Sequence, residues 1–425
     1  MKRWSINRRA LLLALMATSV ASSGLSQAGA PQAAATARPL SPDLGRALDS
    51  YFGNEISTGK IPGAIILVQQ HGRPVYFESF GRRDVASPMG SDAIFRLYSM
   101  TKPVTSVAAM MLVDDGGLRL DDPVSKYIPA FAEARVGIDM KTGDEHATSA
   151  FVAPRRPITI LDLLRHTSGI TYGFYGDDPA RRRYAQLDLA NSDLDSAEWA
   201  DRLARLPLAE QPGTLWDYGH STDVLGRVIE IISGQSLYGF LKRRLLDPLG
   251  MKDTSFYVTD ESKRPRIAEP FANDRMVGPV VGMRDPLEIR RWEAGGSGLV
   301  GTLGDYARFA QMLINGGTLD GRRYLGVTTV AAMTTDQIGP DSGVGRDYYY
   351  FPGDGSGFGL GFAVRTKELA NEPGPIGEYR WDGVGGTFFW IDPKDDMFVI
   401  VMMQAPSQRV RIESEVRKLV YGAME

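Results

Sequence analysis

The longest apolar pattern with helical spacing begins just after residue 100. Five apolar residues recur there at i, i+3, i+4, i+7 and i+8: Val104, Val107, Ala108, Met111 and Leu112. This spacing predicts a helix with one buried stripe. Pro103 is tolerated in a first helical turn, and Gly116-Gly117 is a typical stop signal.

Short apolar or alternating runs near both ends of the chain predict strands, at 64–69, 74–79, 387–391 and 398–403. Helical patterns lie between and around them, at 44–52, 159–165, 223–232, 238–246, 303–314 and 407–421. The order of strands, helices, strands and helix predicts an α+β fold, in which one sheet is built from both ends of the chain. We therefore expect a sheet lobe at about 41–98 and 290–425, with an all-helical lobe inserted at about 99–289.

Residues 1–30 have the features of an export signal peptide. Four basic residues precede a short apolar run at 10–16, and small residues end the segment. The run is too short to span a bilayer, so stable membrane insertion is not expected. Arg8-Arg9 suggests a twin-arginine route, and the Ala/Pro-rich residues 31–40 predict a linker. We expect a periplasmic or secreted protein.

Charge and residue types argue against several function classes. The net charge is −3, and loss of the export signal with its four positive charges would make it −7, which disfavours nucleic acid as a partner. The chain has no cysteine, which excludes disulfides, thiolate chemistry and cysteine-ligated metal sites. Its four histidines are scattered without paired spacing, which argues against a zinc site. We expect no metal and no other cofactor.

Ser99-Met100-Thr101-Lys102 opens the predicted helix. A hydroxyl and an amine three residues apart on a helix share one face and can touch. A helix N-terminus also favours developing negative charge, so the pair suits a serine nucleophile with a lysine base. The same spacing occurs in Ser57-Thr58-Gly59-Lys60, but Ile61-Pro62-Gly63 and a predicted strand follow it. That second pair should therefore share no face.

Two further segments are candidates for completing such a site. Tyr218 lies in a loop before Ser221, which we interpret as the N-cap of the next helix. Its hydroxyl could pass a proton to the leaving group, although many tyrosines are simply half-buried core residues. Residues 381–387, Trp-Asp-Gly-Val-Gly-Gly-Thr, place glycines where a ligand can approach the backbone. A peptide N–H there and that of Ser99 would form an oxyanion hole; the alternative is a glycine-rich hairpin without a ligand.

Taken together, these motifs resemble the serine β-lactamase-like superfamily. The resemblance rests on Ser-Met-Thr-Lys at 99–102, on Tyr-Gly-His-Ser-Thr-Asp-Val-Leu-Gly from Tyr218, and on Trp-Asp-Gly-Val-Gly-Gly-Thr-Phe-Phe-Trp-Ile-Asp-Pro from Trp381. Leu-Leu-Arg-His-Thr-Ser-Gly at 163–169 is also similar to a recurrent sequence of that group. The match spans roughly 41–425, and within the superfamily it is most similar to family VIII carboxylesterases, relatives of class C β-lactamases.

The resemblance implies a serine β-lactamase/transpeptidase-like fold with an antiparallel sheet, and a division of roles. Ser99 would be acylated, while Lys102 and Tyr218 would act jointly as general base and acid. The N–H groups of Ser99 and Val384 would bind the oxyanion. The implied activity is hydrolysis of short-chain carboxylic esters by an exported enzyme. A β-lactamase, a D-peptidase, a transacylase and a non-enzymatic penicillin-binding-like sensor are the alternatives.

Two departures from the class C pattern bear on the substrate. Tyr218-Gly219-His220 stands where those lactamases carry Tyr-x-Asn, and Trp381-Asp382-Gly383 stands where they carry Lys-Thr-Gly. The missing amide and the missing cation would weaken binding of an anionic lactam, whereas Trp381 offers an apolar wall. We therefore expect Trp381, Gly383 and His220 to contact a neutral small-molecule ester. His220 would donate a hydrogen bond or be a loop residue beside the site.

Two other aromatic residues have alternative interpretations. Tyr350, in the segment 346–362, would line or cover an acyl pocket, or belong to an exposed loop packed by its own aromatic residues. His166 could suggest a Ser-His-Asp enzyme, but Thr167-Ser168-Gly169 beside it is typical of a helix C-cap, which favours a structural role. No serine lies in Gly-x-Ser-x-Gly, so the α/β-hydrolase motif is absent. The sequence does not predict the oligomeric state.

Overall fold

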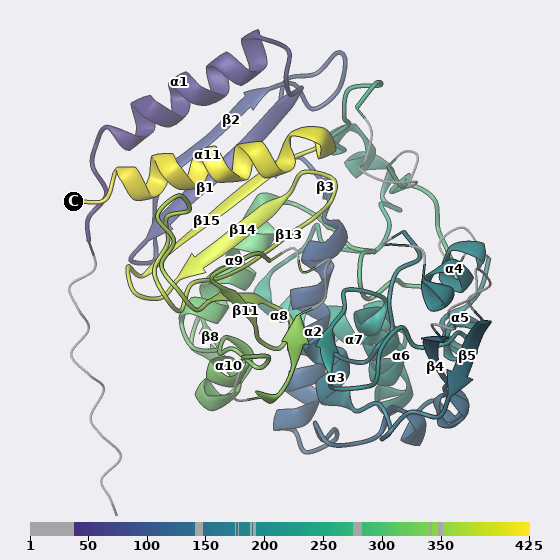
Figure 1. The fold of residues 1–425 in the computed structure, drawn as a ribbon. Helices are drawn as coiled ribbons and strands as arrows, with labels where there is room; N and C mark the ends of the chain where they lie inside the picture. Colours follow the sequence, from purple (N-terminus) through teal and green to yellow (C-terminus); the bar gives the residue numbers. More distant parts are fainter. Residues whose placement is uncertain are drawn as a thin grey trace, which may run out of the picture. The chain divides into compact units, whose positions relative to one another are not determined.

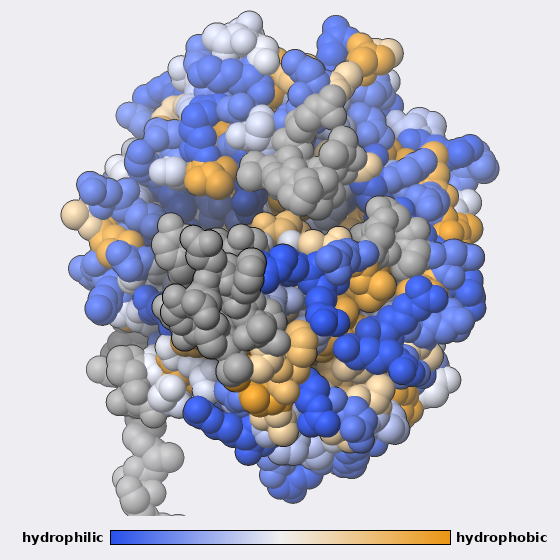
Figure 2. Space-filling view, turned by 45° about the vertical axis from the view of Figure 1, so that its right-hand side comes forward, coloured by the Kyte–Doolittle hydropathy of each residue, from blue (hydrophilic) through white to orange (hydrophobic). Residues whose placement is uncertain are grey.

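The computed structural model describes residues 38–140, 148–174, 176, 178–187, 189, 193–274, 283–339, 342–346, 350 and 352–425. The expected export signal and most of the expected linker lie outside these ranges and stay predictions. Within the described ranges, no helix is long and apolar enough to cross a membrane. Figure 2 shows one face of the molecule, where hydrophobic patches are interspersed among hydrophilic residues.

A seven-stranded antiparallel sheet joins the two ends of the described chain (Figure 1). Its strand order is β11-β12-β13-β14-β15-β1-β2. The strands are β1 (Gly63–Gln70), β2 (Arg73–Gly81), β11 (Ser356–Phe358), β12 (Ala363–Arg365), β13 (Tyr379–Asp382), β14 (Phe388–Asp392) and β15 (Met397–Met403). β1 pairs with β2 and with β15, and the second register places Ala64 opposite Met403. The predicted α+β fold, with one antiparallel sheet built from both chain ends, is confirmed.

Both faces of the sheet are covered, which explains the continuous apolar runs of its central strands. α1 (Leu44–Ser57) and α11 (Arg409–Gly422) lie over one face (Figure 1), and α9 (Leu303–Ile314) packs against the other. Successive side chains of a strand point to opposite faces. In β15, Val399 belongs to the core under α1 and α11, whereas Ile400 belongs to the larger core on the other side. A strand buried on both faces is hydrophobic without interruption.

The segment between β2 and β11 contains most of the helices. The helices of this segment are α2 (Thr101–Asp114), α3 (Ile160–Leu164), α4 (Pro179–Gln186), α5 (Ser196–Ala204), α6 (Ser221–Ser233), α7 (Leu237–Leu241), a π-helix at Lys242–Leu246, α8 (Asp247–Leu249), α9 and α10 (Val327–Met333). Short 3₁₀-helices lie at Tyr98–Met100, Val124–Lys126, Pro129–Glu133, Glu261–Arg266 and Pro406–Gln408. The short strands are β3 (Phe95–Arg96), β4 (Val136–Met140), β5 (Thr148–Val152), β6 (Leu215–Trp216), β7 (Val300–Gly301), β8 (Thr318–Leu319), β9 (Arg322–Arg323) and β10 (Gly345–Arg346). β3 pairs with β7 and leads directly to α2.

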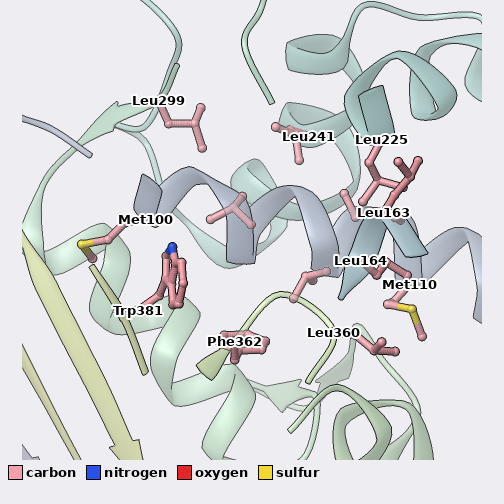
Figure 3. Packing of buried hydrophobic residues seen from close by; sticks show 14 of the residues in the cluster. Met100, Met110, Leu163, Leu164, Leu225, Leu241, Leu299, Leu360, Phe362 and Trp381 are labelled. Carbon is pink, nitrogen blue, oxygen red and sulfur yellow. The ribbon is translucent and has the colours of Figure 1, made fainter. Parts of the chain in front are cut away.

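α2 is buried on every side, so the prediction of a single buried stripe is wrong. All its residues from Thr101 to Leu112 are buried. Figure 3 shows Leu225 and Leu241 on one side of the helix and Phe362 on the other. The helix itself is confirmed, and burial on all sides is typical of a helix in the core of a large domain. The spacing alone did not show that the sheet lobe also packs against it.

Two helix boundaries differ from those expected. α1 continues to Ser57 instead of ending at Phe52. α6 begins at Ser221, with His220 as its N-cap, so the expected N-cap role of Ser221 is wrong. The physical reason is that the Ser221 hydroxyl hydrogen-bonds to the Ser168 hydroxyl at 2.8 Å instead of accepting from the helix backbone.

Residues 38–40, which were expected to belong to the linker before residue 41, contact the rest of the fold. Arg38 donates to the buried Asp395 carboxylate with its backbone N–H at 3.1 Å and with its guanidinium at 2.6 Å. Leu40 forms an isolated antiparallel bridge with Met424. These residues of the expected linker therefore belong to the sheet lobe.

A buried ion pair connects α11 to the sheet. Arg417 donates to the two carboxylate oxygens of Glu378 at 2.7 and 2.6 Å, and Tyr421 donates to the same carboxylate at 2.6 Å. Both charged side chains are almost completely buried. The pair is stable only while both charges are present, because either charge alone is costly in the interior.

Arg417→Ala should destabilise the protein by about 3–5 kcal/mol, because it leaves the Glu378 carboxylate buried without its cation. Lys418→Ala is the matched control on the same helix. It removes the exposed partner of Glu415 and should cost less than about 1 kcal/mol. The midpoint of urea unfolding, followed by circular dichroism, measures both effects. Equal shifts for the two variants would contradict the expectation.

Candidate active site

Ser99 lies in the 3₁₀ turn Tyr98–Met100, one residue before α2 begins at Thr101. Ser99 was expected to open the helix; it lies instead in the short turn that precedes the helix. Tyr98 has a φ of 45°, in the left-handed region that a bulky residue rarely adopts. Its hydroxyl accepts a hydrogen bond from the backbone N–H of Arg284 at 2.9 Å. The backbone is thus held in a strained conformation directly before Ser99, as is common at functional sites.

Lys102 is buried beside Ser99, and its acceptors in the described part of the chain are all neutral. Its Nζ donates to Ser99 Oγ at 3.3 Å, to the Tyr172 hydroxyl at 3.2 Å and to the Gly296 carbonyl at 2.9 Å. Burial lowers the pKa of Lys102 to about 8, although the nearby carboxylates of Asp223 and Asp382 partly oppose this effect. The amine is therefore neutral in a large share of molecules at mildly alkaline pH, which a general base requires.

Tyr218 is the second polar side chain that touches Ser99. Its hydroxyl donates to Ser99 Oγ at 2.7 Å, and Lys102 Nζ lies 4.5 Å from the centre of its ring. The loop that carries Tyr218 is held in place by the buried Asp217. Its carboxylate accepts hydrogen bonds from Arg181 at 2.8 Å and from Thr171 at 3.0 Å. One buried carboxylate therefore connects the segments that carry Tyr218 and Tyr172.

Tyr172 was not among the residues predicted from the sequence. It contacts Lys102 through its hydroxyl, and its ring lies 5.5 Å from the ring of Tyr218. The available signal was the sequence at 163–169, which the resemblance included and which ends three residues before it. Tyr172 and Lys102 are 70 residues apart in the sequence, so no local pattern indicates that they are in contact.

His166 packs against Tyr218 and forms no hydrogen bond with Ser99 in the described structure. Its ring packs 4.9 Å from that of Tyr218 and 5.6 Å from that of Phe358. Burial, and then the charge of Lys102, lower its pKa well below the ordinary value, so the imidazole is neutral. Its φ of 57° places it in a tight turn after α3. This position agrees with the structural role that the sequence favoured.

His220 packs against the site but is also held by a carboxylate. Its Nδ1 lies 2.9 Å from Asp223 Oδ2, and its ring contacts Tyr172 and Trp199 at centroid distances of 4.5 and 5.3 Å. One ring nitrogen is therefore engaged within the protein. This arrangement places the side chain at the edge of the site and favours the loop-residue interpretation over direct donation through Nδ1.

The end of β13 brings a tight turn next to Ser99. The Gly386 N–H donates to the Gly383 carbonyl at 2.9 Å, so Val384 occupies the second position of a four-residue turn. Among the described residues, the Val384 N–H donates no backbone hydrogen bond. Gly383 lies so close to the Leu97 carbonyl that a side chain would overlap it, and this contact holds the turn against the segment of Ser99. The backbone of Gly383 therefore helps to position the turn, and its expected contact with substrate stays a prediction.

Trp381 and Tyr350 lie on the apolar side of the site. Trp381 is buried, with its ring 5.5 Å from that of Tyr218, and Figure 3 shows it beside the first turn of α2. Tyr350 is half-buried, and its hydroxyl donates to the Ser356 carbonyl at 2.8 Å. Its ring packs edge-on against Trp216, which in turn stacks on Tyr218. Trp381 therefore borders the catalytic candidates, whereas Tyr350 lies one aromatic ring further away.

The described ranges contain no group of three His, Asp or Glu side chains arranged to hold a metal ion. The chemistry available at Ser99 is that of a hydroxyl in contact with a phenol and an amine of lowered pKa. Such a hydroxyl, in contact with a proton acceptor, is suited to nucleophilic attack on a carbonyl carbon.

The chain is similar to several known proteins. The model of the Beta-lactamase family matches residues 48–421. An uncharacterized protein of Mycobacterium tuberculosis is 37% identical over 360 residues, which cover 81% of this chain and 86% of that protein. Lovastatin esterase of Penicillium rubens is 32% identical over 382 residues, covering 84% and 92%.

A solved structure shares the fold. The hydrolase EstCE1, described as having promiscuous acyltransferase activity, superimposes with a TM-score of 0.74 at 27% identity, covering 89% of this chain and 99% of its own. The family match spans both the sheet lobe and the helical segment that carry Ser99, Lys102, Tyr218 and Val384. The chain therefore belongs to the beta-lactamase family.

Proposed function

We propose that this protein is a serine esterase that hydrolyses short-chain carboxylic esters through an acyl-enzyme on Ser99. The observation that carries the proposal is the double contact of the Ser99 hydroxyl, with Tyr218 at 2.7 Å and with Lys102 at 3.3 Å. The names of lovastatin esterase and of the hydrolase EstCE1 support the same class of reaction. The features of residues 1–30 support export, so we place this activity in the periplasm or outside the cell.

The reaction follows from the contacts around Ser99. Oγ attacks the ester carbonyl carbon while its proton passes to the Lys102–Tyr218 pair, which we assign jointly. The N–H groups of Ser99 and Val384 stabilise the oxyanion of the tetrahedral intermediate. The carbon–oxygen bond to the alcohol then breaks, and the pair returns the proton to the departing oxygen. Water attacks the Ser99 ester in the second half of the reaction and releases the carboxylic acid.

The walls of the site favour neutral esters over anionic lactams. Trp381 presents an apolar ring next to Tyr218, where a class C lactamase carries a cation. Asp382, the next residue, is an acid that pairs with Arg409. Neither side chain attracts a substrate carboxylate, so a small uncharged acyl group fits this environment best.

Acyl transfer to an alcohol is the second candidate. It differs only in the acceptor that attacks the acyl-enzyme, and the promiscuous acyltransferase activity described for EstCE1 favours it over lactam or peptide hydrolysis. A sensor that is acylated without turnover is disfavoured, because the nucleophile and both proton-transfer groups are in contact.

Ser99→Ala should lower turnover of p-nitrophenyl butyrate by at least about 10⁴-fold, since it removes the nucleophile. Ser57→Ala is the matched control, because Ser57 has the same spacing to a lysine but lies at the end of α1. The release of p-nitrophenol measures both variants. Nitrocefin should be hydrolysed far more slowly than the ester by the wild type. Full activity of Ser99→Ala, or faster turnover of nitrocefin than of the ester, would contradict the proposal.

Val384→Pro should lower kcat for the ester by about 10²–10³-fold, because it removes one N–H donor of the oxyanion hole. Proline is favoured at the second position of such a turn, so the backbone can keep its shape. Val384→Ala shortens the side chain but retains the N–H and should stay near the wild-type rate. A kcat for the proline variant equal to that of the alanine variant would exclude this role for the peptide.

The value of kcat/KM should rise with pH through an apparent pKa of about 8, because the neutral amine of Lys102 is the form that accepts the proton. The lowered pKa means that the rise occurs below the ordinary range of a lysine. Initial rates at low substrate concentration between pH 6 and 10 measure the profile. A rise in kcat/KM with an apparent pKa near 6.5, the ordinary value of a histidine, would instead indicate another base.

A further inference from the structure

Asp223 is a buried carboxylate close to the reacting groups that has no part in the mechanism above. It lies in the first turn of α6, and its side chain is only 2% exposed. Oδ1 accepts the backbone N–H of Gly296 at 2.8 Å, and Oδ2 lies 2.9 Å from Nδ1 of His220. Among the described residues, its carboxylate hydrogen-bonds to Gly296 and His220 and not to Ser99 or Lys102, so we look for its influence on the reaction in these contacts and in its charge.

Gly296 connects this carboxylate to the amine of Lys102. Its N–H is bound by Asp223, and its carbonyl accepts from Lys102 Nζ at 2.9 Å. A side chain at Gly296 would come within about 3 Å of the Asp223 carboxylate, so the contact requires glycine. The neighbouring Gly295 carbonyl accepts the Thr105 hydroxyl at 2.8 Å, which ties the same segment to α2.

The carbonyl of Gly296 also determines where the amine of Lys102 presents its lone pair. A neutral amine has two N–H donors and one lone pair. Gly296 and Tyr172 offer acceptors at 2.9 and 3.2 Å, which occupy the two donors. The lone pair is then left for the Ser99 hydroxyl, the third group in contact at 3.3 Å. A displaced Gly296 carbonyl would allow the amine to turn its lone pair away from Ser99.

We propose that Asp223 is a positioning residue, which fixes Gly296 so that the Lys102 amine faces Ser99. The negative charge of Asp223 also raises the pKa of that amine, against the effect of burial. The inference rests on the proposed function, in which Lys102 and Tyr218 accept the proton of Ser99. His220 belongs to the same unit, because it holds the second oxygen of the carboxylate. This role differs from the substrate contact that the sequence suggested for His220.

The charges around Lys102 make the electrostatic part of this proposal testable. The titratable groups that face the amine or its partners are Tyr172, Tyr218, His166, His220, Asp223 and Asp382. His166 is neutral, because its own pKa is strongly lowered. Asp382 is balanced by its ion pair with Arg409. Asp223 is the larger of the two carboxylate influences that raise the pKa of Lys102, against the effect of burial.

Asp223→Asn separates charge from geometry, because the asparagine carbonyl oxygen can still accept the Gly296 N–H. Loss of the negative charge lowers the pKa of Lys102 further below 8, so the alkaline rise in activity should move to lower pH by about one unit. Asp305→Asn is the matched control. Like Asp223, Asp305 is a mostly buried carboxylate in the first turn of a helix, α9, and it accepts a hydrogen bond from a distant backbone N–H, that of Asp253. It should leave the pH profile unchanged.

The readout is the rate at which a fluorophosphonate labels Ser99, measured between pH 6 and 10. In this step the Ser99 oxygen–phosphorus bond forms, the phosphorus–fluorine bond breaks, fluoride leaves and the hydroxyl proton passes to the Lys102–Tyr218 pair. Labelling depends on activation of Ser99 and not on the ester preference. A wild type that is labelled but hydrolyses no ester would overturn the proposed substrate, and a shifted labelling profile would still support the role of Asp223.

Gly296→Ala provides a second test that leaves the carboxylate in place. Its methyl group crowds Asp223 and displaces the carbonyl, so labelling on the alkaline plateau should fall by about 10²-fold. Gly304→Ala is the control, because a methyl group there meets no atom within 4 Å. A labelling profile of Asp223→Asn that superimposes on the wild type, or an unchanged plateau in Gly296→Ala, would overturn the proposal.

Discussion

The removal of the Lys102 amine from water is the constraint on which the candidate site depends. In the described part of the chain this buried cation forms no ion pair and has only neutral oxygens as acceptors. Elsewhere the protein pairs its buried cations directly, as Arg417 does with Glu378 and Arg181 with Asp217. A direct carboxylate partner would hold the proton on the amine. The absence of such a contact at Lys102 keeps the proton exchangeable.

The helical segment and the sheet supply different parts of this arrangement. The helical segment provides the buried start of α2 and the loops that carry Tyr172 and Tyr218. A hydrogen bond between Thr171 and Asp217 joins these two loops. The sheet provides the turn of Val384, held against the Ser99 segment by the close approach of Gly383 to Leu97. A rigid site needs such non-local contacts, because its candidate groups come from distant parts of the chain.

The parts of the site that could be predicted from the sequence are those with a local signal. Ser99 and Lys102 are three residues apart, and the turn after Trp381 is marked by its glycines. The strands were predictable because their apolar runs are strong, whereas the burial of α2 on all sides depends on packing that spacing does not contain. The functions of Tyr172, Asp223 and Gly296 depend on contacts across 70 residues or more. No periodicity, motif length or charge pattern distinguishes these residues from their neighbours.

The pairing of β1 with β15 has a consequence for how the chain reaches its native state. β1 is apolar on both faces, yet its neighbour β15 ends at Met403, more than 330 residues later in synthesis. During translation, the β1–β2 hairpin therefore has an unpaired hydrophobic edge until β15 has been synthesised. Such edges promote aggregation. The complete sheet can therefore form only after β15 has been synthesised.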